Sequence, residues 1–197
     1  MAALVLASAS PRRQELLRNA GIAFITRPTN IPEVPLKGEN PSEFVARMAW
    51  EKTLAVFHEN PNDFVLGADT IVIVDGEILG KPREEADAAR MLRLLSGRKH
   101  QVTTAVCLAG PLGASNREPK TGFEDKRSET TSVTVAKLSE EDICSYIATR
   151  EPMDKAGAYG IQGVASRWIS RIEGDYFNVV GLPVALVYRM LKERGAF

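Results

Sequence analysis

The chain has few of the side chains from which zinc sites and nucleophilic sites are commonly built. It holds two histidines and two cysteines in 197 residues. His58 and His100 stand apart with no HExxH pattern, so a histidine-based zinc site is not expected. Cys107 and Cys144 form no CxxC pair, which argues against a disulfide framework and fits a reducing compartment. GxSxG and GxxxxGK[ST] motifs are also missing, so a serine-hydrolase elbow and a P-loop are excluded.

An excess of charge and a long apolar run are absent as well. Lys plus Arg and Asp plus Glu number 25 each, so the formal net charge is zero. Nucleic acid or an anionic membrane would call for a basic excess, so neither partner is expected, although a local basic pocket is allowed. No segment approaches the about 20 apolar residues that span a bilayer, and the first residues lack the features of a signal peptide. The sequence therefore predicts a soluble, cytoplasmic protein.

The length fits one domain, or two lobes that share a core. Periodicity and turn residues predict helices at 11–19, from Pro41 onward, at 84–95, from Ser139 onward and at 183–192. Strands are predicted at 4–7, 22–26, 64–79 (a hairpin turned at Asp75-Gly76), 100–110 and from 128 onward. The runs 168–172 and 176–180 predict a second hairpin, and 110–126 an exposed loop.

The stretch LASASPRR joins the first predicted strand to the first predicted helix. Ser10 suits the N-cap of that helix, and Pro11 suits its first position. With the hydroxyl of Ser8 and the guanidinium groups of Arg12 and Arg13, the positive end of the helix dipole would suit a phosphate. An ordinary capped surface helix with two solvated arginines explains the same residues equally well. These residues alone leave both interpretations open.

Two charged residues fall where apolar side chains are expected. Lys52 lies on the apolar face of the helix that begins at Pro41. It either extends its ammonium outward into water or reaches an anion in a cleft. Asp69 interrupts a predicted buried strand, where a carboxylate is costly unless it is paired. A functional role for Asp69 is favoured, because buried acids gather in functional sites.

The remaining candidates are Glu33, in a proline-rich loop, and Lys81, at a strand-to-helix junction. Glu33 and Asp69 are oxygen ligands without a histidine or cysteine, which suits Mg²⁺ or Mn²⁺. Four cations complete the set: Arg12, Arg13, Lys52 and Lys81. Cations together with a metal are what a polyphosphate needs, because its charge sits on the phosphate oxygens. Asp69 can also accept a proton from an attacking water.

The chain resembles the Maf family of nucleoside triphosphate pyrophosphatases in six motifs: LASASPRR, GADTIV, the lysine-proline of GKP, LSG with HQVTTAV, DKAGAYGIQG and NVVGLP. The motifs follow the family's order along nearly the whole chain. The resemblance implies a single domain over residues 1–197 with an α/β fold similar to that of inosine triphosphate pyrophosphatase: an elongated mixed sheet, surrounding helices, and two lobes with a central cleft. It also implies hydrolysis between the α- and β-phosphates with a divalent metal, giving a monophosphate and pyrophosphate.

The resemblance also implies roles for individual residues. Asp69 of GADT matches the proton acceptor, and Glu33 and Asp69 match metal ligands. The positions that match phosphate contacts are Ser8, Ser10, Arg12, Arg13, Lys52 and Lys81. A homodimer is compatible with the family.

GADT followed by AGAYGIQG is similar to the branch of the family that acts on dTTP and UTP. Substrate choice in that branch is associated with Arg12, Thr70 and Gln162. An amide such as that of Gln162 suits this role, because it offers both a donor and an acceptor to a pyrimidine edge. The resemblance leaves open whether modified pyrimidine triphosphates are also substrates. Two further hypotheses fit the sequence: a pyrophosphatase of the same fold for 7-methyl-GTP or non-standard purine nucleotides, and a non-catalytic nucleotide-binding regulator of cell division.

Overall fold

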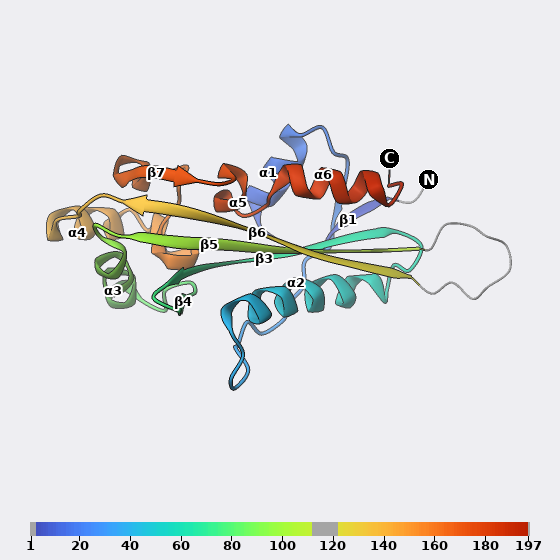
Figure 1. The fold of residues 1–197 in the computed structure, drawn as a ribbon, viewed down its shortest axis with the longest axis horizontal. Coiled ribbons are helices and arrows are strands. Elements are labelled where there is room, and N and C mark those ends of the chain that lie inside the picture. Colours follow the sequence, from blue (N-terminus) through green and yellow to red (C-terminus); the bar gives the residue numbers. More distant parts are fainter. Residues whose placement is uncertain (1–2, 112–121, 197) are drawn as a thin grey trace, which may run out of the picture. The chain divides into compact units, whose positions relative to one another are not determined.

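The computed structural model describes residues 3–111 and 122–196, which form a mixed α/β fold around one sheet (Figure 1). Seven strands lie in these residues: β1 (Leu4–Leu6), β2 (Ile25–Thr26), β3 (Phe64–Val74), β4 (Glu77–Leu79), β5 (Lys99–Gly110), β6 (Phe123–Val135) and β7 (Ile169–Glu173). Their order is β2-β1-β3-β5-β6-β7, and β4 pairs with β3. β1 pairs in parallel with β2 and β3, whereas β3–β4 and β6–β7 are antiparallel.

The helices connect and cover these strands. They are α1 (Pro11–Asn19), α2 (Pro41–Phe57), α3 (Glu85–Leu95), α4 (Glu140–Ala148), α5 (Tyr176–Val180) and α6 (Val184–Glu193), with the short 3₁₀ segments η1 (Glu151–Asp154), η2 (Ala156–Ala158) and η3 (Val164–Trp168). Parallel neighbours need a crossover connection, and α1 supplies it between β1 and β2. In the part of the chain that the structure describes, no helix is long and apolar enough to cross a membrane.

The chain divides into two compact units, and β3, β5 and β6 contribute to both. The first unit comprises Met1–Asp69, Thr104–Glu129 and Gly181–Phe197, and the second comprises Thr70–Thr103 and Thr130–Val180. Asp69 and Thr70, neighbours in the chain and both predicted site residues, therefore belong to different units.

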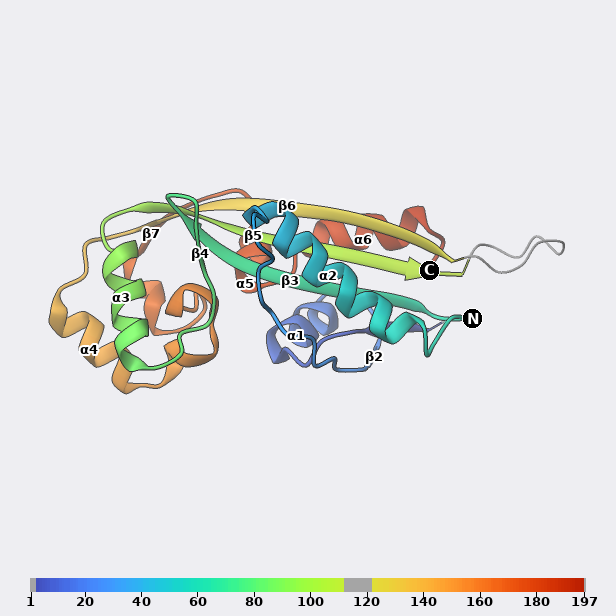
Figure 2. The same ribbon diagram turned by 90° about the horizontal axis from the view of Figure 1, so that it is seen from below.

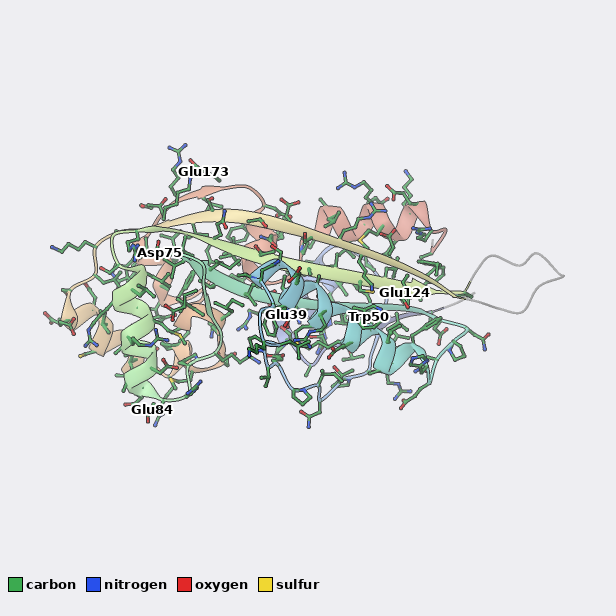
Figure 3. All side chains as sticks on the ribbon, turned by 60° about the horizontal axis from the view of Figure 1, so that its bottom comes forward. Glu39, Trp50, Asp75, Glu84, Glu124 and Glu173 are labelled. Carbon is green, nitrogen blue, oxygen red and sulfur yellow. The ribbon has the colours of Figure 1, made fainter. Side chains whose placement is uncertain are left out.

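In the first unit, helices cover both faces of the sheet. Helix α2 lies on one face, and α1 and α6 lie on the other (Figures 1 and 2). Val56 of α2 packs with Val5 of β1, with Ala7, which directly follows β1, and with Val65 of β3. At the surface, Trp50 Nε1 of α2 donates to Glu124 Oε2 of β6 at 2.6 Å (Figure 3). Helix α2 is thus held to the sheet by apolar packing and by a side-chain hydrogen bond.

Gly67 allows α2 to approach β3 closely. A Cβ on Gly67 would lie 2.3 Å from Thr53 Oγ1 and 2.7 Å from the carbonyl oxygen of Ala49. Thr53 Oγ1 is 2.8 Å from that same carbonyl oxygen. Asp69 shares the face of β3 that carries Gly67, because side chains alternate along a strand. The close contact between helix and strand therefore sets Lys52, next to Thr53, against Asp69.

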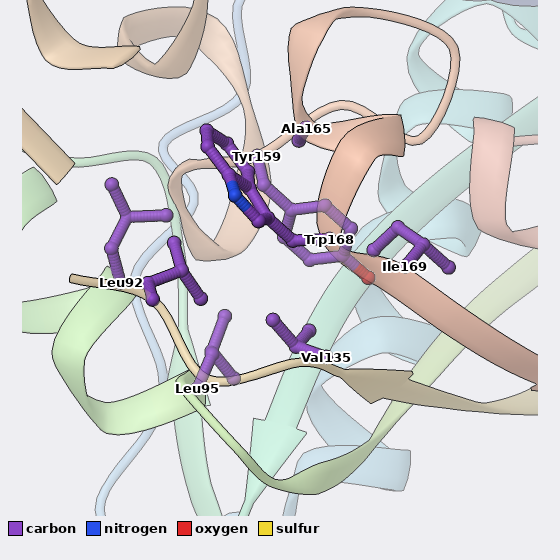
Figure 4. Close-up of a pocket in the computed structure, with 8 residues that line it drawn as sticks. Leu92, Leu95, Val135, Tyr159, Ala165, Trp168 and Ile169 are labelled. Carbon is purple, nitrogen blue, oxygen red and sulfur yellow. The ribbon is translucent and has the colours of Figure 1, made fainter. Parts of the chain in front are cut away.

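In the second unit, α3 and α4 build an apolar core with the sheet and the 3₁₀ segments. The helix predicted at 84–95 is confirmed as α3, and its apolar face is buried: Ala88, Met91, Leu92 and Leu95. An apolar hollow in this core is lined by Leu92, Leu95, Val135, Leu138, Tyr159, Ala165, Trp168 and Ile169 (Figure 4). Its volume of about 10 Å³ is near that of one water molecule, so the hollow belongs to the core and is too small for a nucleotide.

Several element boundaries follow from local signals, as predicted. Ser10 accepts the backbone N–H of Arg13 and caps α1, and capping boxes begin α2 at Asn40 and α4 at Ser139. Asp75 and Gly76 both have positive φ, 50° and 81°, which is typical of a type I′ hairpin between β3 and β4. The predicted Ser10 cap and the predicted Asp75-Gly76 hairpin are confirmed.

The second predicted hairpin is wrong in its second half. Residues 169–173 form a strand, but β7 pairs with β6, and Tyr176–Val180 is the helix α5. Asp175 Oδ1 accepts the backbone N–H of Phe177 at 2.8 Å, which stabilises a helical start. Asn178, fully buried, donates to the carbonyl oxygen of Val102 at 2.9 Å. These polar contacts favour the helix over the strand that the apolar run predicted.

Two strand boundaries also differ from the prediction. β2 is shortened to Ile25–Thr26, and β6 begins at Phe123 rather than at 128. Asp125 is buried in this early part of β6 and is paired with Arg127 and Arg194. This pairing explains how a charged run can form a strand. Most of the loop predicted at 110–126 lies outside the described residues.

We expect Gly67→Ala to lower the free energy of unfolding by about 1–3 kcal/mol, because the added methyl would force α2 away from β3. Urea unfolding measures this change. Gly80→Ala is the matched control, since a Cβ there meets nothing within 4 Å. Equal stability of the two variants would contradict the close packing of α2 on β3.

Candidate functional site

The loop between β1 and α1 holds a guanidinium in a fixed position. Ser8 is buried, and its Oγ accepts from the backbone N–H of Ser10 at 3.2 Å and from Arg13 Nη1 at 3.1 Å. Arg13 Nε donates to the carbonyl oxygen of Gly181 at 2.8 Å. Ser10 caps α1, so its hydroxyl lies at the positive end of the helix dipole. Two hydroxyls and an oriented cation therefore meet at a helix N-terminus.

Gly181 is a contributor that the sequence did not predict. It precedes α6 and lies 168 residues from Arg13 in the chain, yet its carbonyl orients that guanidinium. Its φ of 128° lies in a region that glycine adopts readily and other residues rarely do. The signal that the sequence carries for it is the motif NVVGLP, whose spacing alone indicates no partner.

Lys52 does not extend into water, although it lies on an apolar helix face. The side chain is buried, and its Nζ lies 2.7 Å from Asp69 Oδ1 and 2.6 Å from Glu33 Oε1. One ammonium therefore brings together two carboxylates, one from β3 and one from the loop before α2. Glu33 is the more exposed partner, since 42% of its side chain is accessible.

Burial makes the Asp69 carboxylate more basic than usual. Loss of solvent raises the pKa of Asp69, while the charges of Lys52 and Arg13 oppose that rise. Burial lowers the pKa of Arg13, and the charges of Asp69 and Glu33 act in the opposite direction. Arg13, Lys52, Asp69 and Glu33 all belong to the first unit, and we refer to them together as its charged region. A carboxylate of raised pKa in such a region suits a proton acceptor.

The charged residues of this region fit a metal that arrives with its own ligands. In residues 3–111 and 122–196, no group of three or more His, Cys, Asp or Glu could hold a metal ion. Glu33 and Asp69 nevertheless bring two carboxylates to the Lys52 ammonium, and each contacts it through one oxygen. Mg²⁺ is commonly bound by one or two carboxylates together with substrate phosphates and water. The two carboxylates suit that mode of binding and not an all-protein cage.

Three predicted site residues lie in the second unit. Thr70 is half-buried in β3, Lys81 is exposed between β4 and α3, and Gln162 is exposed in the turn after η2. The carbonyl oxygen of Gly80 accepts the backbone N–H of Gly157 at 3.0 Å, which joins the GKP segment to the DKAGAYGIQG segment. Arg12, the remaining candidate, is half-buried in the first turn of α1.

The buried histidine and cysteine do not supply a second catalytic centre. His100 Nε2 lies 2.8 Å from the Tyr159 hydroxyl, and burial lowers the pKa of His100 to about 4, so the ring stays neutral. Burial raises the pKa of the Cys107 thiol to about 11, which keeps it protonated and unreactive. Both residues are buried and belong to the core.

Residues 3–194 match the family model described as Maf-like protein. The chain is 57% identical over 192 residues to the dTTP/UTP pyrophosphatase of Koribacter versatilis, covering 98% of this chain and 94% of the relative. It is 49% identical over 195 residues to the dTTP/UTP pyrophosphatase of Symbiobacterium thermophilum, covering 99% and 95%. The solved structure of the Staphylococcus aureus Ham1 protein matches at a TM-score of 0.49 and 15% identity, covering 97% of this chain and 98% of that one. The family match spans both compact units, and the chain belongs to the Maf-like protein family.

Proposed function

We propose that this chain is a nucleoside triphosphate pyrophosphatase that hydrolyses dTTP and UTP to the monophosphate and pyrophosphate. Relatives of that name, 57% and 49% identical over nearly the whole chain, support the proposal. The structural observation that carries it is the buried Asp69 carboxylate, held with Glu33 on the Lys52 ammonium. Both units together would form one pyrophosphatase domain over residues 1–197.

Binding of the phosphates is assigned to the β1–α1 loop and to further cations. Among the described residues Ser8 Oγ accepts two hydrogen bonds, and as a hydroxyl it can also donate one to a phosphate oxygen. Arg13 is oriented before substrate binds, so less conformational entropy is lost on binding. The other phosphate contacts in the proposal are Ser10, Arg12, Lys52 and Lys81. Lys52 pairs with both Asp69 and Glu33, and the charges of the same two carboxylates raise the pKa of Arg13 against the effect of burial.

Asp69 is the proposed base for the attacking water. As the water oxygen bonds to one phosphorus of the α–β bridge, its proton passes to the Asp69 carboxylate and the bridging P–O bond breaks. The raised pKa of Asp69 makes it a better acceptor for that proton. Lys52 keeps the carboxylate oriented and compensates its charge while it is ionised.

Glu33 and Asp69 would hold a divalent cation, Mg²⁺ or Mn²⁺, whose charge offsets that of the phosphate oxygens when it is bound. Recognition of the nucleobase is assigned to Arg12, Thr70 and Gln162. The Gln162 side chain is exposed, so its amide is accessible to a pyrimidine edge. A cytoplasmic location and a homodimer stay predictions from the sequence.

A nucleotide panel tests the proposed activity. Pyrophosphate release is measured from dTTP, UTP, 7-methyl-GTP and purine triphosphates, with Mg²⁺, with Mn²⁺ and with a chelator. We expect metal-dependent release from dTTP and UTP. Release confined to purine or methylated substrates would contradict the assignment to the dTTP/UTP branch. Nucleotide binding without release would favour a regulator that does not hydrolyse its ligand.

Asp69→Asn is expected to lower kcat for UTP by about 10²–10⁴-fold, since the amide cannot accept the water's proton. Circular dichroism checks that the fold is intact. Asp125→Asn is the matched control: Asp125 is also a buried carboxylate of the first unit, but it pairs with Arg127 and Arg194. The control should lose stability and keep its kcat. Full activity of Asp69→Asn would rule out Asp69 as the base and direct attention to Glu33.

A further inference from the structure

Gln162, the residue proposed to recognise the nucleobase, lies at the centre of a tight turn. The backbone N–H of Gly163 donates to the carbonyl oxygen of Gly160 at 3.1 Å, which closes a turn around Ile161 and Gln162. Ile161 is buried, whereas Gln162 is exposed. The buried Ile161 side chain therefore anchors the turn, and the Gln162 side chain faces solvent.

Two side chains from elsewhere in the second unit hold the ends of this turn. The backbone N–H of Gly160 donates to the Tyr146 hydroxyl at 3.1 Å, and that of Val164 donates to Glu151 Oε2 at 3.1 Å. The Tyr146 hydroxyl in turn donates to Glu151 Oε1 at 2.9 Å. A single tyrosine–glutamate pair thus bridges the two backbone groups on either side of Gln162.

The pair is itself rigidly placed. Tyr146 is completely buried in α4, and its ring meets that of Trp168 edge-on with centroids 5.5 Å apart. Burial raises the pKa of Tyr146, so the hydroxyl keeps the proton that it donates to Glu151. Lys155 Nζ donates to the backbone carbonyl of Glu151 at 2.6 Å, which fixes the start of η1.

Gly163 leaves the space that the Glu151 carboxylate occupies. A Cβ on Gly163 would lie 2.1 Å from Glu151 Oε1 and 2.5 Å from Oε2. The backbone of Gly163 has φ of −100°, so a positive φ is not the reason for glycine at this position. Close approach of the carboxylate to the turn is the reason that remains.

We propose that Tyr146 and Glu151 are positioning residues for substrate choice, which fix the turn from Gly160 to Val164 so that the Gln162 amide meets the pyrimidine edge in one place. The inference rests on the proposed function and extends it to two residues that act through Gln162. A mobile turn would have to be ordered whenever a nucleotide binds, which costs affinity. It would also let the amide reach bases with a different donor and acceptor pattern.

The first test compares Tyr146→Phe and Glu151→Gln with the wild type on UTP, dTTP and CTP. We expect KM for UTP and dTTP to rise by about 10-fold, because a lost hydrogen bond of about 1.4 kcal/mol corresponds to that factor. We also expect kcat to change little and the preference for UTP over CTP to fall. Tyr176→Phe, which removes the hydroxyl of an exposed tyrosine in the same unit, should leave all three quantities unchanged. An unchanged KM and preference in both test variants would overturn the inference.

Gly163→Ala provides a second route to the same effect. The added methyl should displace the Glu151 carboxylate and reproduce the kinetics of Glu151→Gln. In a Glu151→Ala background the steric conflict is gone, so adding Gly163→Ala should cause no further rise in KM. A further rise of the same size as in the wild-type background would show that Gly163→Ala acts independently of Glu151, against the inference.

A double-mutant cycle asks whether Tyr146 acts through Gln162. Tyr146→Phe added to Gln162→Ala should cost nothing more in the preference for UTP, and independent, additive losses would contradict the proposed route. A wild-type protein that releases no pyrophosphate from any nucleotide would instead refute the proposed function. Hydrogen exchange of the Gly160 and Val164 backbone amides then still decides whether the pair holds the turn: faster exchange in Tyr146→Phe supports it, and unchanged exchange refutes it.

Discussion

The charged region of the first unit depends on one buried ammonium, that of Lys52, shared between Asp69 and Glu33. Burying a charge is costly unless it is paired and hydrogen-bonded, so Lys52 and Asp69 each require the other at that position. The pairing in turn demands close packing of α2 on β3, which Gly67 permits. It also ties the Glu33 loop to the sheet. Packing and charge are therefore satisfied by the same few contacts.

The two units contribute different parts of the proposed chemistry. The first holds Asp69, the proposed proton acceptor, the Lys52 ammonium that pairs with it, and the N-terminus of α1 with the Ser10 hydroxyl. The second holds the turn that contains Gln162, and the backbone on either side of this turn is hydrogen-bonded to Tyr146 and Glu151. In the proposal, bond cleavage relies on the burial and raised pKa of Asp69. Recognition of the nucleobase relies on the backbone geometry of the Gln162 turn. Substitutions at Asp69 and in the Gln162 turn should accordingly change different kinetic constants.

Local signals made part of this predictable from the sequence. The Ser10 cap and the Asp75-Gly76 hairpin follow from neighbouring residues, and Lys52 stands out because it interrupts an apolar helix face. Contacts between distant segments leave no such signal. Neither the pairing of Arg13 with the Gly181 carbonyl nor the Tyr146–Glu151 bridge can be deduced from spacing or periodicity. Helix α5 is misassigned from the sequence because its apolar pattern outweighs the single capping aspartate.

The dependence of the fold on the Lys52–Asp69 pair is measured most directly by a double-mutant cycle in the free energy of unfolding. Lys52→Met alone should cost about 3–5 kcal/mol at neutral pH, because it removes the ammonium that is hydrogen-bonded to the buried Asp69 carboxylate. That cost should shrink as pH falls, since protonation removes the unpaired charge. Lys52→Met combined with Asp69→Asn should be more stable than Lys52→Met alone. Simple addition of the two single costs would show that the two side chains are not coupled, and would contradict the central role of this ion pair.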